Sequence, residues 1–201
     1  MTFLVNNCNH WISYHIIDEL LNNGYEVEGL KNGEKNEHLL MYFGRNSHFS
    51  LSENDKTKQY HTVISLNNPL PGVKSKYVHV INPEGHRNEK EGVSFIQAPL
   101  LFGEWMPMNE KGMYVNEKFI PFDSEHFLTK SIYIKDFTKA FVQWIRSENK
   151  ITNLDILSEN NRNEWLKLES STYLRDNRPV KEQLARVIEH YRMYKEMYDC
   201  K

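Results

Sequence analysis

The sequence predicts an α/β fold in which a mostly parallel sheet is flanked by helices and followed by a small C-terminal lobe. The first observation behind this prediction is a strand, a helix and a second strand within residues 2–30. Such a βαβ unit is parallel and right-handed in nearly all proteins. The second is a series of short segments rich in β-branched and aromatic residues before residue 100. The third is a pair of amphipathic helices after residue 130.

The βαβ unit begins with the apolar residues 2–5, which lead into a polar loop and a helix. Asn23-Gly24 is a typical helix C-terminus, and residues 25–30 form the second predicted strand. The helix has apolar residues at spacings of three and four, which places them on one face: Ile12, Ile16, Ile17, Leu20 and Leu21.

The remaining elements are predicted from local patterns. A stripe of apolar residues at 137–145 predicts a helix with Asp136 as its N-cap. A second stripe, from Val180 to Tyr198, predicts a helix that begins behind Pro179. A short helix is expected at residues 39–43, and strands are expected at residues 48–51, 62–66, 77–81 and 93–98.

Composition excludes several classes of protein. The chain has 201 residues, a length typical of one domain, with 39% hydrophobic and 26% charged residues, as in globular proteins. Its net charge is -2 with both signs interspersed, so neither nucleic acid nor an anionic membrane is an expected partner. No apolar run is long enough to span a membrane, and Cys8 and Cys200 lie far apart. These features predict a cytoplasmic protein.

Metal and thiol chemistry have weak support in the sequence. The nine histidines lack the spacing of metal ligands, so no metal is expected. Cys8 stands between a strand and a helix, where the helix dipole would lower the pKa of the thiol and make it reactive. An unreactive structural thiol is the alternative.

Several segments of the chain resemble, in order and spacing, the sequence segments of one protein family. Residues 62–68 resemble the family's fourth strand. Ala98-Pro99-Leu100-Leu101-Phe102-Gly103 resembles its segment of the type Arg-Pro-x-x-Val-Tyr-Gly. Residues 131–145 resemble its His-Val-Asp-Asp-Val-Ala strand and helix, with Asp136 on the second Asp. With its C-terminal helix, the chain resembles the extended short-chain dehydrogenase/reductase family, the NAD-dependent epimerase/dehydratase group that works on nucleotide sugars. The resemblance implies a Rossmann-like fold. It implies one domain, 1–201, with a Rossmann-like core at 1–100 and a substrate-lobe-like region with closing helices at 101–201.

The chain departs from that family at the cofactor loop. The family's Thr-Gly-x-x-Gly-x-x-Gly motif falls on Asn6, Asn7, His10 and Ser13, so a side chain replaces every glycine. Those glycines allow a tight turn and the close approach of backbone to pyrophosphate. Lys31 stands where an acidic residue holds the ribose; a lysine favours a 2′-phosphate, but His10 projects where the pyrophosphate would lie. We therefore expect no cofactor, with NAD or NADP only under the alternative function given below.

The family's catalytic groups are also missing, so no catalytic residue is assigned. Asn82 stands where a Ser or Thr polarises the substrate, and residues 83–92 leave no room for the helix that carries Tyr-x-x-x-Lys. Two such strings occur elsewhere, and we interpret Tyr114 as a loop residue and Tyr191 as a core residue.

The connection at residues 67–76 is likewise too short for a crossover helix. A Pro-rich turn at Pro69 and Pro71 is expected in its place. Because the family's long helices at this position form its dimer interface, a homodimer of this chain would need another surface.

Two hypotheses about function follow. The first is a catalytically silent epimerase-like protein that binds a partner protein, or a small ligand of sugar or nucleotide type, at the carboxyl ends of the strands. The alternative is an NAD(P)-dependent nucleotide-sugar epimerase or reductase with a variant cofactor loop, whose proton donor would be His86, Glu84 or Tyr114. The polar residues expected in the crevice are Asn6, Asn7, Asn9, His10, Lys31, Asn67, Asn68 and Asn82.

Other interpretations stay open at this point. The asparagines fit equally well as residues that cap helices and fill turns. The crevice is either open or filled by His10 and Trp11. Residues 105–108 form either an exposed patch for a protein partner or a part of the core beneath the following loop.

Overall fold

A computed structural model describes residues 1–33, 36–52, 57–85, 87, 91–147, 152–158, 171–174 and 177–198. The main sheet has eight strands in the order β13-β12-β6-β5-β4-β1-β2-β3, and every neighbouring pair is parallel. The strands are β1 (Thr2–Asn6), β2 (Glu26–Leu30), β3 (Phe49–Leu51), β4 (Gln59–Leu66), β5 (Lys74–Ile81), β6 (Val93–Gln97), β12 (Asn153–Ser158) and β13 (Ser171–Leu174). The predicted fold class is confirmed, and β1, which lies between β4 and β2, is parallel to β2 as expected.

The small lobe is built from residues that follow β6. It contains a parallel pair, β7 with β11, and a three-stranded antiparallel sheet, β8 to β10. Because β12 and β13 return to the main sheet, that sheet draws strands from both halves of the chain, and the division at residue 100 stays a prediction. The lobe strands are β7 (Leu100–Phe102), β8 (Met108–Asn109), β9 (Gly112–Val115), β10 (Lys118–Pro121) and β11 (Ser131–Tyr133).

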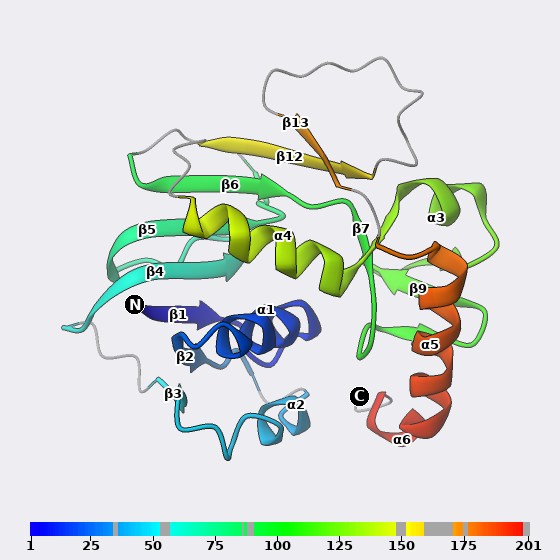
Figure 1. The fold of residues 1–201 in the computed structure, drawn as a ribbon, viewed down its shortest axis with the longest axis horizontal. Helices are drawn as coiled ribbons and strands as arrows, with labels where there is room; N and C mark the ends of the chain where they lie inside the picture. The colour runs from blue at the N-terminus through cyan, green and yellow to red at the C-terminus, as the bar shows by residue number, and fades with distance from the viewer. Residues whose placement is uncertain are drawn as a thin grey trace.

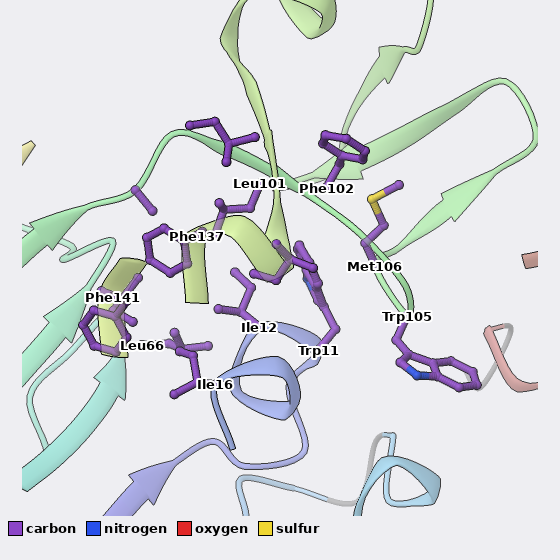
Figure 2. Packing of buried hydrophobic residues seen from close by; sticks show 14 of the residues in the cluster. Trp11, Ile12, Ile16, Leu66, Leu101, Phe102, Trp105, Met106, Phe137 and Phe141 are labelled. Carbon is purple, nitrogen blue, oxygen red and sulfur yellow. The ribbon is translucent and has the colours of Figure 1, made fainter. Parts of the chain in front are cut away.

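The two long helices beside the main sheet, α1 and α4, lie next to each other on one face of it (Figure 1). Ile12 and Ile16 of α1 lie in one core cluster with Phe137 and Phe141 of α4, as Figure 2 shows. Burial of these apolar side chains supplies the main stabilisation of the fold. The helices are α1 (Trp11–Asn22), α2 (His38–Met41), α3 (Glu125–Lys130), α4 (Ile134–Arg146), α5 (Val180–Met193) and α6 (Lys195–Tyr198).

The opposite face of the sheet is covered differently. Its cluster contains Leu4 and Val63, and in the described residues it is closed by Leu70 and Val73 rather than by a helix. Both belong to the connection between β4 and β5, which carries the two prolines. The expected loss of the crossover helix is confirmed. Residues 67–73 cross this face of the sheet without forming a helix.

Two local predictions were wrong. The N-cap of α4 is Tyr133, so Asp136 lies inside the first turn, where its buried carboxylate accepts hydrogen bonds from Asn177 and Gln183. The apolar stripe fixed the helix but not its first residue. Tyr114 lies in strand β9 rather than in a loop, paired with Phe119 across a hairpin and 42% exposed.

Candidate functional site

The candidate site lies where the strand order reverses. From β1 the chain continues to β2 and β3 on one side, whereas β4, β5 and β6 extend the sheet on the other. In open α/β sheets ligands bind outside the carboxyl ends of the strands at such a switch point. Three neighbouring strands end in asparagines with left-handed backbone: Asn7 (φ 55), Asn67 (φ 65) and Asn82 (φ 51) after β1, β4 and β5. Asparagine tolerates this conformation better than most residues with a side chain.

The loop between β1 and α1 keeps a tight turn without glycine. The left-handed Asn7 lets the His10 N–H donate to the Asn7 carbonyl at 2.8 Å. The Cys8 N–H donates to the carbonyl of Leu30, which ties the loop to the end of β2. Ser13, at the third glycine position of the family motif, is buried and its hydroxyl lies 3.4 Å from the Asn6 carbonyl. The backbone turn therefore survives although the glycines do not.

His10 caps helix α1 with its own side chain. It has extended backbone, and its Nδ1 accepts the N–H of Ile12 at 3.2 Å. Burial lowers the pKa of His10 to about 4, so the ring is neutral near pH 7. The next residue, Trp11, is buried in the core cluster. Of the two residues expected to fill the crevice, Trp11 packs inward, and His10 covers the end of the helix.

Asn9 joins the loop to the segment that follows β2. Its buried side chain donates to the carbonyls of Asn32 and Gly33 at 3.1 and 3.3 Å and accepts the Asn32 N–H at 3.1 Å. Lys31 lies just before this contact, with its Nζ 2.5 Å from Glu37 Oε1 and its side chain 41% exposed. The structure thus brings Asn9 and Lys31 to the same edge of the site.

The asparagines after β4 and β5 form two further groups. Asn67 and Asn68 donate to the carboxylate of Glu84 at 2.9 and 3.4 Å. Asn82 accepts the Ala98 N–H at 2.9 Å, so its side chain fastens the end of β5 to the end of β6. The eight predicted residues all end or follow neighbouring strands, and their contacts place them in three groups. Asn67 and Asn68 contact Glu84, and Asn82 contacts the end of β6. The other five lie around the β1–α1 loop and the end of β2: Asn6, Asn7, Asn9, His10 and Lys31.

A cluster of ionisable residues in the lobe was missed at the sequence level. Glu104 Oε1 accepts the Tyr133 hydroxyl at 2.7 Å and lies 3.3 Å from the Nζ of Lys135. Burial and the neighbouring Glu104 carboxylate raise the pKa of Tyr133, whereas a catalytic Tyr-x-x-x-Lys pair needs a tyrosine with a lowered pKa. This tyrosine therefore keeps its proton. Its spacing of two from Lys135, rather than four, gave no signal in the sequence.

Burial decides the role of several other residues that the sequence left open. Cys8 is fully buried and burial raises the pKa of its thiol to about 11, so it is a structural thiol rather than a reactive one. Tyr191 is buried as expected. Trp105, Met106 and Met108 are buried too, and Figure 2 shows Trp105 pointing away from Trp11, toward the C-terminal helices that supply its ring neighbours. Of the alternative proton donors, His86 lies outside the described residues.

The described part of the chain has neither a metal-ion cluster nor a membrane-spanning helix. No group of three or more His, Cys, Asp or Glu side chains there has the geometry to hold a metal ion. No helix in the same residues has the length and apolar composition needed to cross a membrane.

Comparisons with known proteins agree with this fold. No protein-family model matches the sequence, and no curated protein matches it. Among solved structures, dTDP-glucose 4,6-dehydratase from Bacillus anthracis, in complex with NAD, has a TM-score of 0.63 at 7% identity, with 98% of each chain covered. UDP-glucose 4-epimerase from Thermotoga maritima, with UDP-glucose, has a TM-score of 0.56 at 12% identity, covering 96% of this chain and 99% of that one. Yeast methylglyoxal/isovaleraldehyde reductase Gre2, complexed with NADPH, has a TM-score of 0.51 at 16% identity, with 100% of both chains covered.

These structures correct one expectation. The absence of a cofactor was predicted from the side chains at the glycine positions, yet solved structures of the same fold hold NAD or NADPH. The expectation rested on His10, whose ring was predicted to project into the path of the pyrophosphate. In the structure its Nδ1 instead caps helix α1, and the left-handed Asn7 keeps the turn that glycine would otherwise provide. The chain has the fold of the NAD(P)-dependent epimerases, dehydratases and reductases.

Proposed function

We propose that this chain binds a nicotinamide dinucleotide across the carboxyl ends of β1, β2 and β4, with a preference for NADP(H). The observation that carries the proposal is the β1–α1–β2 unit, in which left-handed Asn7 makes the tight turn before a helix of 12 residues. The positive end of a helix dipole and its free N–H groups favour an anion such as pyrophosphate. The solved structures that hold NAD or NADPH in this fold support the same location.

The residues at the carboxyl ends of β1 and β2 fit two groups of the dinucleotide, the pyrophosphate and the ribose of the adenosine. The start of α1 offers backbone N–H groups to the pyrophosphate, and Lys31 follows β2, where the ribose would lie. The Lys31 pair with Glu37 is exposed on both sides, and exposed ion pairs contribute little stability. A 2′-phosphate, with nearly two negative charges, therefore replaces Glu37 as the partner of Lys31 at small cost. This chemistry favours NADP(H) over NAD(H).

Binding and turnover are separate parts of the proposal. A bound nicotinamide dinucleotide supplies or accepts a hydride, whereas the proton must come from the protein or from water. The described residues between β5 and β6 form no helix, so the family's Tyr-x-x-x-Lys pair has no place there. We infer a protein that binds the dinucleotide without that pair and is catalytically silent toward nucleotide sugars.

Turnover of a nucleotide sugar is the second candidate function, and one observation favours it. The exposed carboxylate of Glu84 is held by Asn67 and Asn68 at the edge where the strands end. A carboxyl group fixed in this way is able to exchange a proton with a bound substrate. Incubation of the protein with NADP⁺ and UDP-glucose or dTDP-glucose distinguishes the two candidates, because the oxidised cofactor is able to accept the hydride that the sugar loses. Only turnover that is lost in Glu84→Gln supports this one.

The test of binding is a titration of the chain with NADPH and with NADH, followed by calorimetry. We expect NADPH to bind more tightly. Lys31→Ala should weaken NADPH binding by about 10- to 150-fold, the factor that corresponds to roughly 1.5–3 kcal/mol for a hydrogen bond to a charged group. NADH binding should not change.

The matched control is Lys118→Ala, which removes an exposed lysine from β10 in the lobe. It should leave both titrations unchanged. A correctly folded wild-type chain that binds neither NADPH nor NADP⁺ at millimolar concentration contradicts the proposed function.

The surroundings of the chain are inferred from composition alone. We infer a cytoplasmic location, because the two cysteines are far apart and no disulfide framework is present in the sequence. A homodimer, if it forms, would use a surface other than the helical face that the family uses.

A further inference from the structure

The end of helix α1 is already occupied by a side chain of the protein. The first turn of a helix has N–H groups without intrahelical partners, and an incoming anion would accept hydrogen bonds from them. In α1 the N–H of Ile12, the second helical residue, donates instead to Nδ1 of His10 at 3.2 Å. Histidine is not among the residues preferred as N-caps, which are Ser, Thr, Asp and Asn. The cap is therefore an unusual one, at the position where the related fold has a glycine.

The state of the imidazole follows from this bond. Nδ1 accepts, so in the neutral ring the proton lies on Nε2. Burial lowers the pKa of His10 to about 4, which agrees with a neutral acceptor. The ring also lies beside the Trp11 indole, with centroids 6.1 Å apart. One hydrogen bond and one ring neighbour thus fix the imidazole over the end of the helix.

We propose that His10 is an internal cap that competes with pyrophosphate for the N-terminus of α1. In the free protein the imidazole accepts the Ile12 N–H, and it has to rotate away before the ligand takes that group. The inference rests on the proposed function, because it assigns the regulation of the same site. It explains how a chain with a side chain at the second glycine position keeps a dinucleotide site, although a weakened one.

The effect of the His10 cap on the affinity for the dinucleotide has an expected magnitude. Binding of the dinucleotide exchanges one protein hydrogen bond for one to the ligand, so the internal cap lowers affinity by the factor of one ordinary hydrogen bond, about three- to tenfold. Removing the cap should therefore raise the affinity by the same factor. A contrary role for His10, as a donor to the ligand through Nε2–H, makes the opposite prediction, since removal would then weaken binding.

The test compares wild type with His10→Gly and His10→Ser, using NADPH and 2′-AMP as ligands. His10→Gly removes both ring and cap, and we expect it to bind NADPH about three- to tenfold more tightly. His10→Ser removes the ring but keeps a hydroxyl that accepts from the helix end, so its affinity should lie between the other two. 2′-AMP carries the 2′-phosphate but no pyrophosphate, so its affinity should be the same for all three proteins.

A second measurement observes the helix end and the His10 ring directly rather than through affinity. Amide exchange at Ile12 in the wild-type chain should be slow without ligand because its N–H is bonded, and it should be faster in folded His10→Gly. Saturation of the wild type with NADPH should shift the NMR signals of the His10 ring as the ring leaves the helix.

The outcomes separate the inference from the proposed function. If wild type binds NADPH and neither variant binds it more tightly, or the His10 signals do not move, the internal cap is wrong and the proposed function stands. If NADPH and 2′-AMP bind to none of the three folded proteins, the proposed function is wrong, and the inference about the His10 cap is wrong too.

Discussion

His15 Nε2 lies 3.0 Å from the main-chain carbonyl of Glu104, and this bond joins helix α1 to the segment after β7. A carbonyl oxygen only accepts, so Nε2 carries the hydrogen. The Glu104 side chain is held in turn by Tyr133. One buried histidine thus connects the first helix beside the main sheet to the lobe, through a bond that spans 89 positions of the sequence.

Buried histidines make the stability of the fold depend on pH. His15 and His79 are 2% and 5% exposed, and burial lowers the pKa of each to about 4 from 6.5. Between these values the unfolded chain binds protons that the folded chain does not, so stability is lost as pH falls from about 6.5 toward about 4. Each histidine accounts for at most about 3 kcal/mol. Urea unfolding at pH 7, 6 and 5 measures the slope.

The slope has a matched control. His79→Phe should reduce it, because the ring stays apolar at every pH, whereas exposed His126→Gln should leave it unchanged. An unfolding free energy that does not change between pH 7 and 5 contradicts the assignment of these histidines as neutral.

Asp136 should be among the side chains most needed for stability. Its buried carboxylate accepts the Asn177 backbone N–H at 3.1 Å and the Gln183 amide at 3.0 Å, which holds the start of α5 against α4. Asp136→Ala leaves these donors without partners and should cost about 3 kcal/mol. Chemical denaturation measures the loss. Exposed Asp123→Ala is the control, and a loss equal to that of the control would sink the interpretation.

Gly103 is required by close packing rather than by its backbone angle. A Cβ at this position would overlap Cγ2 of Ile134 at the start of α4. Gly103→Ala should therefore destabilise the fold by about 1–3 kcal/mol, as overpacking does. In combination with Ile134→Ala, which removes that atom, the total should be smaller than the sum of the single changes. Gly44→Ala, where the nearest atom is 3.6 Å away, should have little effect; strict additivity of the Gly103 pair would contradict the overlap.

The left-handed backbone of Asn67 after β4 predicts how strongly different substitutions there lower the free energy of unfolding. Asn67→Gly should keep the unfolding free energy within about 0.5 kcal/mol, because glycine adopts φ 65 without strain. Asn67→Val should cost about 1–2 kcal/mol or more, since a β-branched residue is strained there. Asn68→Val tests the adjacent position, which lacks a positive φ, and should be nearly neutral. Equal effects at the two positions would show that the backbone angle is not the cause.

The sequence was sufficient for the parts of the fold that depend on local pattern. The unit from β1 to β2 follows from the spacing of Ile12, Ile16 and Leu20, and the missing crossover helix follows from chain length alone. The hairpins of the lobe were missed, because β8, β9 and β10 have only 2, 4 and 4 residues, too few to form an alternating pattern. Asp136 was misplaced as a cap because its partner, Asn177, lies 41 positions away.

The candidate site was predictable in position but not in detail. Parallel strands end at one edge, which is why Asn7, Asn67 and Lys31 were expected near one another. The bonds from Asn9 to residues 32 and 33 and the cap formed by His10 depend on rotamers and on long-range contacts, which a single sequence does not contain. The error about the cofactor has the same origin, because it rested on the direction of the His10 side chain, which is set by its rotamer.

The connection between β4 and β5 has one more consequence, which concerns covalent reach. Strand β4 ends at Leu66, and β5 begins at Lys74, which is paired with Gln59 at the start of β4. The connection therefore has to return along the whole length of β4, about 23 Å at 3.3 Å per residue. Eight steps of fully extended chain span at most about 29 Å, and part of this is used in leaving the sheet and rejoining it. An alignment displaced by two residues toward the start of β4 would need about 30 Å. The contour length of residues 67–73 therefore forbids that slip of β5, whatever side chains the two strands carry.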